Sequence, residues 1–271
     1  MQPRVITFRA FQHEPHAMLS TLPKLRLLRL QGVPIFDQLK LEEALFRVDR
    51  DNWFIWNERT QSTNIVMGIS GKPAKLLDVD AVARDNIPII KRFSGGGTVV
   101  VDDSTLFTTF IVNTNALPHV KPFPREIMEW SSTFYTPLFG SLTGTNEVFQ
   151  LREDDYVFGD RKFGGNAQSI GKDRWLHHTS FLWDYQPSNM RYLQNPTKQP
   201  KYRAQRDHTE FLCKLKDVVE SQDELFQAFH HQLNEHFDLT EVTLTEEEIQ
   251  DMVGKEHRKS TKWIDLATST Y

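Results

Sequence analysis

A glycine-rich segment in the first half of the chain combines residue types that could bind an anion. Three successive glycines, Gly95, Gly96 and Gly97, follow Arg92 and Ser94. Glycines leave backbone N–H groups open to an anion, and the arginine and serine add a charged fork and a hydroxyl. A strand-like run follows, whereas the glycine loops of P-loop and dinucleotide-binding proteins lead into a helix. The segment is predicted to cradle an anion, although alone it also fits a flexible hairpin loop.

A second glycine-containing segment lies about seventy residues later and carries a lysine. Lys162 is followed by Gly164, Gly165 and Asn166. A lysine ammonium is a compact point charge that can bridge two anionic oxygens, such as a carboxylate and a phosphate. That is the arrangement that an adenylating enzyme requires. The alternative is a solvent-exposed lysine beside a tight turn.

Two groups of histidines are candidates for a metal or a pocket. His177 and His178 are adjacent in a strand-like run, so strand alternation points them to opposite faces, and at most one of them faces a pocket. They cannot both chelate one metal from a regular strand. His230, His231 and His236 fall on an expected helix without further ligands, and we interpret them as solvent-facing residues.

The elements that must position these residues follow from periodicity and turn signals. A first amphipathic helix is expected over residues 35–48, with Asp37 as its cap, and a second begins at Pro124. Two hairpins are expected between residues 156 and 185, with turns at 159–160 and 171–173. Short β-branched or aromatic runs predict strands at 53–56, 65–69, 87–90, 98–101 and 106–112.

The last part of the chain is expected to be helical. Ser221 with Glu224, and Thr245 with Glu248, form two capping-box patterns ahead of apolar residues at helical spacing. Residues 187–206 are rich in Pro, Asn, Gln and Lys and predict a long surface loop. Hairpins outnumber alternating strand–helix units, so the fold class is predicted to be α+β, with a largely antiparallel central sheet flanked by helices.

Composition excludes several classes of protein. The 271 residues carry a formal net charge of −4, with 39% hydrophobic and 25% charged residues, which is typical of a soluble globular chain and not of a general nucleic-acid binder. No stretch is long and apolar enough to suggest a membrane span. The single cysteine, Cys213, permits no intrachain disulfide and no cysteine-based zinc site, and favours a reducing intracellular compartment.

The N-terminal residues differ in charge from the rest. Residues 1–34 contain five basic residues and one acid. Residues 1–25 are therefore interpreted as an extension, for which two explanations stay open: an organelle-targeting peptide, or a solvated segment of a cytoplasmic protein. The localisation expected is cytoplasmic or mitochondrial.

The motifs together resemble a known family. The segment 91–99, KRFSGGGTV, resembles the Arg-Arg-x-Ser-Gly-Gly-Gly-x-Val motif of the lipoate–protein ligase A family, within the biotin/lipoate ligase superfamily. The segment 159–168, GDRKFGGNAQ, and the run His177–Thr179 resemble two further motifs of that family, in the same order. The resemblance extends upstream through residues 41–44 and 66–70, and covers roughly residues 26–210.

The resemblance implies a fold and a set of site residues. The fold would be a catalytic domain similar to those of class II aminoacyl-tRNA synthetases and biotin ligases, over residues 26–271, with C-terminal helices and no full accessory domain. Lys162 would bind both the lipoyl carboxylate and the α-phosphate. Asp155, or its neighbour Asp154, would help to place the nucleotide and Mg²⁺. The residues expected to line the acyl and nucleotide pocket are Gly68, Arg92, Ser94, Gly95, Gly96, Gly97, Thr98, Asp155, Gly164, Gly165, Asn166, His178 and Thr179.

The implied activity has two steps. Lipoate would be activated with ATP as lipoyl-AMP, and the lipoyl group would then pass to a lysine of a carrier domain, either of a 2-oxoacid dehydrogenase complex or the glycine cleavage H protein. Two alternatives stay open: an octanoyl- or other acyltransferase without ATP activation, and a non-catalytic lipoyl- or nucleotide-binding relative. Val101 stands where the family has a histidine, which motivates the last. Cys213 lies in an apolar context outside the motifs, so a thioester mechanism is not expected.

Overall fold

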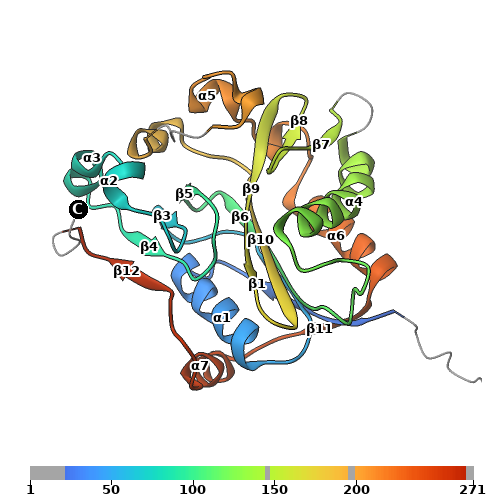
Figure 1. Cartoon of the computed structure of the whole chain (residues 1–271). Coiled ribbons are helices and arrows are strands. Elements are labelled where there is room, and N and C mark those ends of the chain that lie inside the picture. Colours follow the sequence, from blue (N-terminus) through green and yellow to red (C-terminus); the bar gives the residue numbers. More distant parts are fainter. Residues whose placement is uncertain (1–21, 144–146, 195–198, 267–271) are drawn as a thin grey trace, which may run out of the picture.

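The protein, seen here as a computed structural model that describes residues 22–143, 147–194 and 199–266, is built on two β-sheets (Figure 1). The larger sheet has eight strands in the order β11-β1-β2-β6-β10-β9-β8-β7. Adjacent strands in this sheet run antiparallel, except that β1 is parallel to β2 and to β11. The strands are β1 (Lys24–Leu30), β2 (Trp53–Asn57), β6 (Thr105–Asn113), β7 (Phe149–Arg152), β8 (Asp155–Phe158), β9 (Arg161–Ile170), β10 (Arg174–Leu182) and β11 (Asp238–Val242).

The smaller sheet carries the glycine-rich segment. Its four strands lie in the order β12-β4-β3-β5, and β3 is parallel to β4. They are β3 (Asn64–Met67), β4 (Ile89–Lys91), β5 (Thr98–Val101) and β12 (Lys262–Ile264). Residues 92–97 join β4 to β5, and we refer to them below as the glycine loop.

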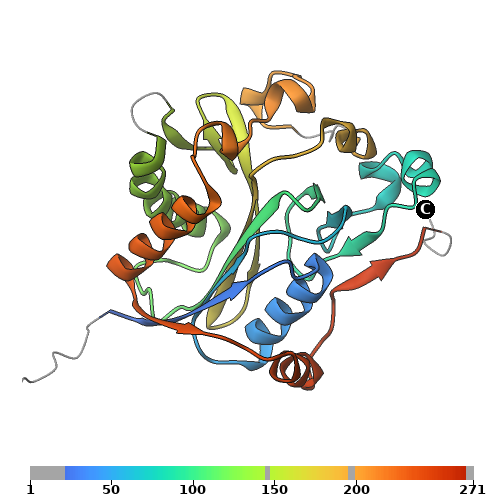
Figure 2. The ribbon, with the colours of Figure 1, turned by 180° about the vertical axis from the view of Figure 1, so that it is seen from behind.

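Helices cover both faces of the larger sheet. The α-helices are α1 (Ile35–Val48), α2 (Pro73–Leu76), α3 (Val79–Arg84), α4 (Pro124–Thr143), α5 (His208–Phe211), α6 (Gln222–His236) and α7 (Glu246–Gly254). Helices α4 and α6 lie together on one face, and α1 lies on the other with α7 beside it (Figures 1 and 2). Covering both faces explains why β2 and nearly all of β6 are buried along their length.

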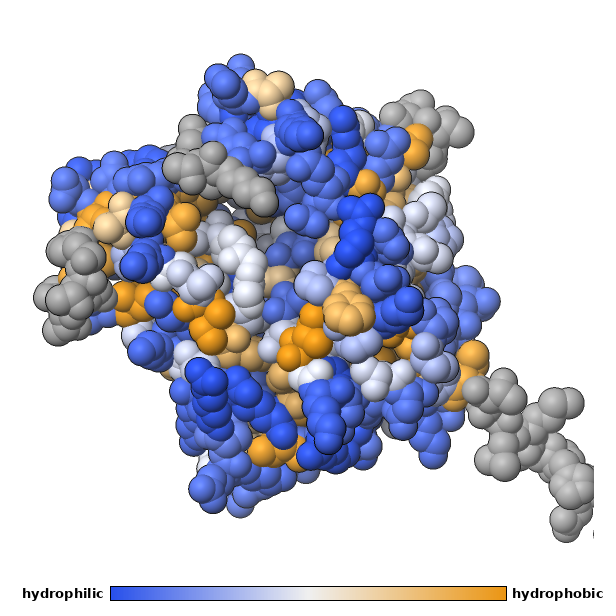
Figure 3. All heavy atoms as spheres, viewed as in Figure 1, coloured by the Kyte–Doolittle hydropathy of each residue, from blue (hydrophilic) through white to orange (hydrophobic). Residues whose placement is uncertain are grey.

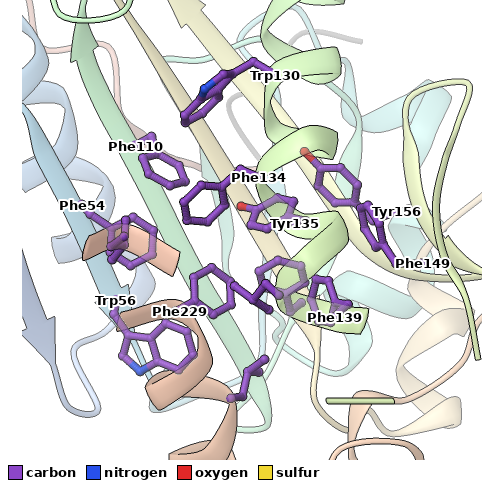
Figure 4. Packing of buried hydrophobic residues seen from close by; sticks show 14 of the residues in the cluster. Phe54, Trp56, Phe110, Trp130, Phe134, Tyr135, Phe139, Phe149, Tyr156 and Phe229 are labelled. Atoms are coloured by element: carbon purple, nitrogen blue, oxygen red, sulfur yellow. The ribbon is translucent and has the colours of Figure 1, made fainter. Parts of the chain in front are cut away.

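An aromatic core fills the space under α4 and α6. Phe54 and Phe110 of adjacent strands have ring centroids 4.7 Å apart, and Phe134 of α4 lies 5.2 Å from Phe110 (Figure 4). Phe229 of α6 meets Trp56 edge-on at 5.1 Å. These edge-on and tilted arrangements are the favoured geometries for aromatic pairs, and they fix the sheet against the two helices.

Most of the elements predicted from sequence are confirmed, including both hairpins and the capping box at Thr245. The α+β class is confirmed, but the strands form two sheets, because β3 pairs with β4 on one side and with β5 on the other. Asp37 does not cap α1: the helix begins after Pro34, and Asp37 lies in its first turn, 3.8 Å from Lys40. The predicted loop over residues 187–206 includes two short 3-10 turns, Pro187–Tyr192 and Lys201–Arg203.

The structure bears on two further expectations, the N-terminal extension over residues 1–25 and the lack of a membrane span. Strand β1 begins at Lys24, so residues 24 and 25 belong to the fold and not to the expected extension. Residues 1–21 of the candidate targeting segment lie outside the described residues. Among the described residues, no helix is both long and apolar enough to cross a bilayer.

Candidate active site

A cavity of about 520 Å³ opens between the glycine loop and strands β9 and β10. Figure 3 shows the hollow near the middle of this face of the molecule. Its apolar wall comes from α1, both sheets and α4, and its polar wall from β8, β9 and β10. The lining includes Leu39, Val66, Gly95, Gly96, Gly97, Thr98, Val99, Phe107, Met128, Asp154, Asp155, Lys162, Gly165, Asn166, Gln168, His178 and Ser180. A mainly apolar cavity with a few convergent polar groups is the usual form of a small-molecule site.

Arg92 holds the glycine loop together from inside. Its guanidinium donates to the carbonyl oxygens of Gly95 at 2.7 Å, Gly97 at 2.8 Å and Val66 at 3.3 Å. The side chain is 4% exposed, and burial lowers the pKa of Arg92 to about 10, although the charge of Glu42 opposes this. An arginine with that pKa is still charged at neutral pH. Arg92 therefore fixes the shape of the loop, and it also lines the cavity, as predicted from sequence.

A buried chain of hydrogen bonds connects Arg92 to Glu42. Arg92 Nε donates to Ser94 Oγ at 3.0 Å, Ser94 Oγ lies 2.9 Å from His178 Nε2, and His178 Nδ1 lies 2.9 Å from Glu42 Oε2. The guanidinium donates to the Ser94 hydroxyl, and the carboxylate of Glu42 accepts from Nδ1–H of His178; with Nδ1 as the donor, a neutral imidazole leaves Nε2 to accept from Ser94. The chain joins a buried cation to a buried anion.

The order Ser94, His178, Glu42 has the geometry of a nucleophile, a base and an orienting carboxylate. Ser94 is nevertheless fully buried, its hydroxyl accepts from Arg92, and it is not among the residues that line the cavity. A nucleophile must reach its substrate. We therefore interpret Ser94 as a residue that positions the loop, while His178 lines the cavity beside it.

Lys162 and Asp155 form the charged centre of the cavity. Lys162 Nζ lies 2.6 Å from Asp155 Oδ1, and its side chain is 23% exposed. The other carboxylate oxygen accepts a hydrogen bond of 2.8 Å from the hydroxyl of Tyr202. Burial and the charge of Asp155 raise the pKa of Tyr202, which therefore stays protonated and donates. An entering anion has to compete with Asp155 for the lysine ammonium.

A second cavity, of about 300 Å³, lies on the other side of these residues. It is mostly apolar, with contributions from Leu182, Met190, Leu193, Phe211 and Leu212, and with Arg203 and His208 among its polar members. The two cavities share Gly97, Thr98, Val99, Asp155, Lys162, Gly165 and Ser180. The hydroxyl of Thr98 is buried in this shared wall without a hydrogen-bond partner. The lysine and an unpaired hydroxyl thus stand where ligands in the two cavities would meet.

Residues 34–238 match the family model of the lipoyl protein ligase A/B catalytic domain. The chain belongs to this family. It is 30% identical, over 67% of its length, to a protein of Plasmodium falciparum called inactive lipoate–protein ligase 2. It spans about 61% of the length of that relative.

The fold is that of solved lipoate–protein ligases. A bi-partite ligase from Thermoplasma acidophilum, described with its E2 lipoyl domain, superposes with a TM-score of 0.69 over 86% of this chain and 91% of that chain. A lipoate–protein ligase A bound with ATP gives a TM-score of 0.66 over 86% and 93%. Both are 18% identical to this chain, so the likeness shows a shared fold.

The structure sorts the site residues predicted for this lipoyl ligase domain into two groups. Several line the cavities as expected, and Arg92, the glycines 95–97, Thr98, Asp155, Lys162, Gly165, Asn166 and His178 are among them. Others support the site from behind. Gly68 lets β3 approach the glycine loop, because a Cβ there would clash with the carbonyl oxygen of Gly96, and Gly164 makes room for Phe181 and Tyr156.

Thr179 is a wrong prediction. The alternation that brings His178 and Ser180 to the cavity turns Thr179 and His177 to the opposite face. There the Thr179 hydroxyl lies 3.5 Å from the hydroxyl of Tyr135 in the aromatic core. Thr179 was expected from the family resemblance alone. Strand alternation from His178, applied one step further, would have placed Ser180 in the site and Thr179 on the opposite face.

Two further residues were missed. Glu42 lies on the buried face of α1, where a carboxylate is rare. A carboxylate among the apolar residues of that helix face was the sequence signal that could have identified it. Glu42 also accepts hydrogen bonds from Thr109 Oγ1 at 2.6 Å and Gln38 Nε2 at 2.7 Å. Tyr202 lay in the loop-like stretch 187–206, where no sequence signal identified it.

Of the histidines considered from sequence, His177, His230, His231 and His236 line neither cavity, and the same is true of Cys213. His177 is fully buried, and burial lowers its pKa to about 3. His230 and His236 are half-buried on α6 and not fully solvent-facing as predicted, whereas His231 is exposed. Burial raises the pKa of the Cys213 thiol to about 11, and the thiol donates to the carbonyl oxygen of Arg161.

Proposed function

We propose that the protein activates lipoate with ATP as lipoyl-AMP and transfers the lipoyl group to a lysine of a lipoyl-accepting carrier domain. The observation that carries the proposal is the position of Lys162, whose ammonium stands in the wall shared by two cavities. A carboxylate reaching it from one cavity and a phosphate from the other would both meet this cation. The ATP-bound and E2-associated ligases that share the fold support the substrates and the partner.

The first step forms a mixed anhydride. A carboxylate oxygen of lipoate attacks the α-phosphorus of ATP, the bond from that phosphorus to the bridging oxygen breaks, and pyrophosphate leaves. Negative charge builds on the phosphoryl oxygens, so donors fixed beforehand stabilise the transition state most. Lys162 supplies the cation, the hydroxyl of Thr98 supplies a donor without a partner, and Arg92 holds the glycine loop in its shape.

The second step transfers the acyl group. The amine of the carrier lysine attacks the carbonyl carbon of lipoyl-AMP, the bond to the phosphate oxygen breaks, AMP leaves, and the amine loses its proton. No nucleophile of the protein is required. The buried Cys213, with its raised pKa, does not line either cavity, which argues against a thioester route for this chain.

Mg²⁺ is the metal that this chemistry calls for, because it neutralises phosphate charge. Among the described residues, no group of three or more His, Cys, Asp or Glu side chains is arranged to hold a metal alone. Asp154 and Asp155 both line the larger cavity, and Mg²⁺ commonly takes one or two carboxylates together with substrate phosphates and water. The residues present fit such a role, with Asp155 as the ligand once Tyr202 releases it.

ATP–pyrophosphate exchange tests the first step. Lipoate should support exchange better than octanoate or biotin, and Lys162→Ala should lower the rate by roughly 10²-fold or more, as for removal of a transition-state donor. Lys24→Ala, at an exposed position at the start of β1, is the matched control. Lack of exchange by the wild type with all three acids would refute activation by this chain.

A transferase that uses preformed lipoyl-AMP is the second candidate. It is motivated by the relative that is named inactive and by Val101, which lies fully buried among Ile90, Val66 and Phe107 in place of a polar residue. Transfer from synthetic lipoyl-AMP to a recombinant lipoyl domain, without exchange, would favour it. Tight lipoate binding with neither exchange nor transfer would indicate a non-catalytic relative. Transfer of octanoyl groups without ATP–pyrophosphate exchange would indicate an acyltransferase.

A further inference from the structure

Three loops meet beside the glycine loop and share one composition. Each carries an exposed apolar residue and a lysine within three positions: Ile69 with Lys72, Phe123 with Lys121, and Ile170 with Lys172. The exposed fractions of Ile69, Phe123 and Ile170 are 39%, 60% and 40%. Few large apolar residues in the described chain are this exposed, so three at one place need an explanation.

Hydrogen bonds show that the loops are neighbours. Ile69 N donates to Ser94 O at 3.0 Å, and Gly95 N, the next residue along, donates to Gln168 O at 3.0 Å. The side chain of Gln168 in turn donates to Pro124 O at 3.3 Å. Ile69, Phe123 and Ile170 each lie within two residues of this set of contacts. We call the three loops the rim.

The rim borders the larger cavity. Pro124 and Ile170 are among the residues that line it, and the glycine loop forms its edge. Figure 3 shows hydrophobic residues gathered next to the hollow on this face. A group that enters the cavity from solvent on this side passes over the rim.

The rim is also locally basic. Segments 69–72, 121–125 and 170–173 contain four cations and one acid, whereas the whole chain has a net charge of −4. Arg125 is paired with Glu129. Among the described residues, the lysines that form ion pairs lie elsewhere, at positions 40, 162, 214, 216 and 255. The three rim lysines are therefore available to a partner.

We propose that the rim is the docking surface for the acceptor, a small carrier domain with acidic residues around its target lysine. This inference rests on the proposed function. An extended lysine side chain spans only about 6 Å from Cα to Nζ, so the backbone of the carrier must come down onto the border of the cavity for its amine to reach the acyl group. Phe123 is the aromatic anchor, and the lysines steer the acidic carrier.

Carrier binding and ligand binding can be measured separately. We would determine the dissociation constant of a recombinant, unlipoylated E2 lipoyl domain for the full chain, and independently that of lipoyl-AMP. Phe123→Ser and the triple variant K72E/K121E/K172E should weaken carrier binding at least tenfold and leave lipoyl-AMP binding within twofold. The triple variant should also lose the salt dependence that the wild type shows.

Matched controls come from other surfaces. Val148 is as exposed as Phe123, at 60%, but lies at the outer edge of the larger sheet, so Val148→Ser should bind the carrier like the wild type. Lys24→Glu controls for the change in charge. Equal carrier affinity in wild type and rim variants, or no carrier binding by the wild type, would overturn the docking inference. Failure of the wild type to bind lipoyl-AMP would instead count against the proposed function.

Discussion

At the scale of single residues, the site depends on two buried groups of opposite charge that do not touch and are connected by hydrogen bonds through two other side chains. Arg92 and Glu42 belong to the glycine loop and to α1, and Ser94 and His178 join them. A buried charge is tolerated when it is compensated and hydrogen-bonded. Glu42 therefore compensates the cation that holds the glycine loop, without having to contact the ligand that the loop receives.

Glu42→Gln tests this compensation. The amide keeps the shape of the side chain but removes the negative charge, so the protein should lose roughly 3 kcal/mol of unfolding free energy, the lower end for breaking a buried ion pair. Lipoate should also bind at least tenfold more weakly, because the loop that borders its cavity is no longer held in one shape. Urea unfolding and calorimetric titration measure the two effects.

A control separates the loop from general stability. Glu58 is a half-buried carboxylate that accepts from Arg29 Nε at 2.6 Å, away from both cavities. Glu58→Gln should cost some stability and leave lipoate affinity unchanged. Equal losses of affinity in the two variants would contradict a specific role for Glu42.

His177 makes a second prediction at this scale, for pH. Its ring contacts the hydroxyl of Tyr156 at 2.9 Å, and burial lowers its pKa to about 3, from an ordinary value near 6.5. Between these values the unfolded chain binds a proton that the folded protein does not, so stability falls as the pH drops through this window. Urea unfolding at pH 7 and pH 4.5 should show that the free energy of unfolding decreases less between these two pH values for His177→Gln than for the wild type.

Other groups also contribute to acid unfolding, so the comparison needs its own control. Burial alone would raise the pKa of Asp184, but Lys214 and Lys216 outweigh it and lower that pKa to about 2. His231→Gln, at an exposed position on α6, should keep the decline of the wild type. An unchanged decline in His177→Gln would show that the buried histidine does not set the pH dependence.

At the scale of elements, the turn between β7 and β8 holds the segment around Tyr202 over the second cavity. The Tyr202 hydroxyl donates to Asp155, Glu153 Oε1 accepts from Lys201 N at 2.6 Å, and the Arg152 guanidinium lies 4.7 Å from the Tyr202 ring. The Tyr202 hydroxyl occupies one oxygen of the Asp155 carboxylate, and the other oxygen pairs with Lys162. A nucleotide that binds at Asp155 and Lys162 is therefore expected to release the segment around Tyr202.

Tyr202→Phe isolates the hydroxyl, since the ring and its contact with Arg152 stay. We expect trypsin to cleave after Lys201 or Arg206 several-fold faster in the variant, while the urea midpoint changes little. Tyr192→Phe removes a comparable hydrogen bond, to Asp85 at 3.1 Å, and serves as the control. Identical cleavage rates would mean that Glu153 and the contact between Arg206 and Asp160 hold the segment without Tyr202.

The same elements show what sequence could and could not predict. Turn signals and alternation located both hairpins, and alternation correctly allowed only one histidine of the pair to face a pocket. The partners of Glu42 lie 67 and 136 residues away along the chain, at Thr109 and His178, so no local pattern could reveal them. The split into two sheets was equally hidden, because it depends on which strands pair and not on where strands occur.

At the scale of the whole molecule, the last described residues connect the two sheets. β11 adds to β1 at one edge of the larger sheet, α7 packs on α1, and β12 adds to β4 at one edge of the smaller sheet. We call residues 255–266 the C-terminal strap. The whole strap follows α7 and lies outside the part matched by the family model, which ends at residue 238.

Two contacts fasten the strap to α1. The carboxylate of Glu43, which is 1% exposed, accepts from the backbone N–H groups of Ser260 and Thr261 at 2.8 Å each. Trp263 stacks on Phe36 with ring centroids 4.3 Å apart. Since β12 pairs with Lys91, the residue before Arg92, the strap also supports the strand that leads into the glycine loop.

A chain ending at Gly254 should therefore fold less stably and bind lipoate several-fold more weakly, because β4 becomes an unpaired edge and the glycine loop loses one of its supports. Hydrogen exchange should quicken at Ile89–Lys91 and at Gly95, whose N–H bonds to β9, and stay slow in β6 at the centre of the larger sheet. Glu43→Gln, which loosens the strap but leaves β12 in the chain, should show an intermediate effect at the same amides. Faster exchange spread evenly over both sheets would instead mean that the strap stabilises the whole protein and has no particular effect on the site.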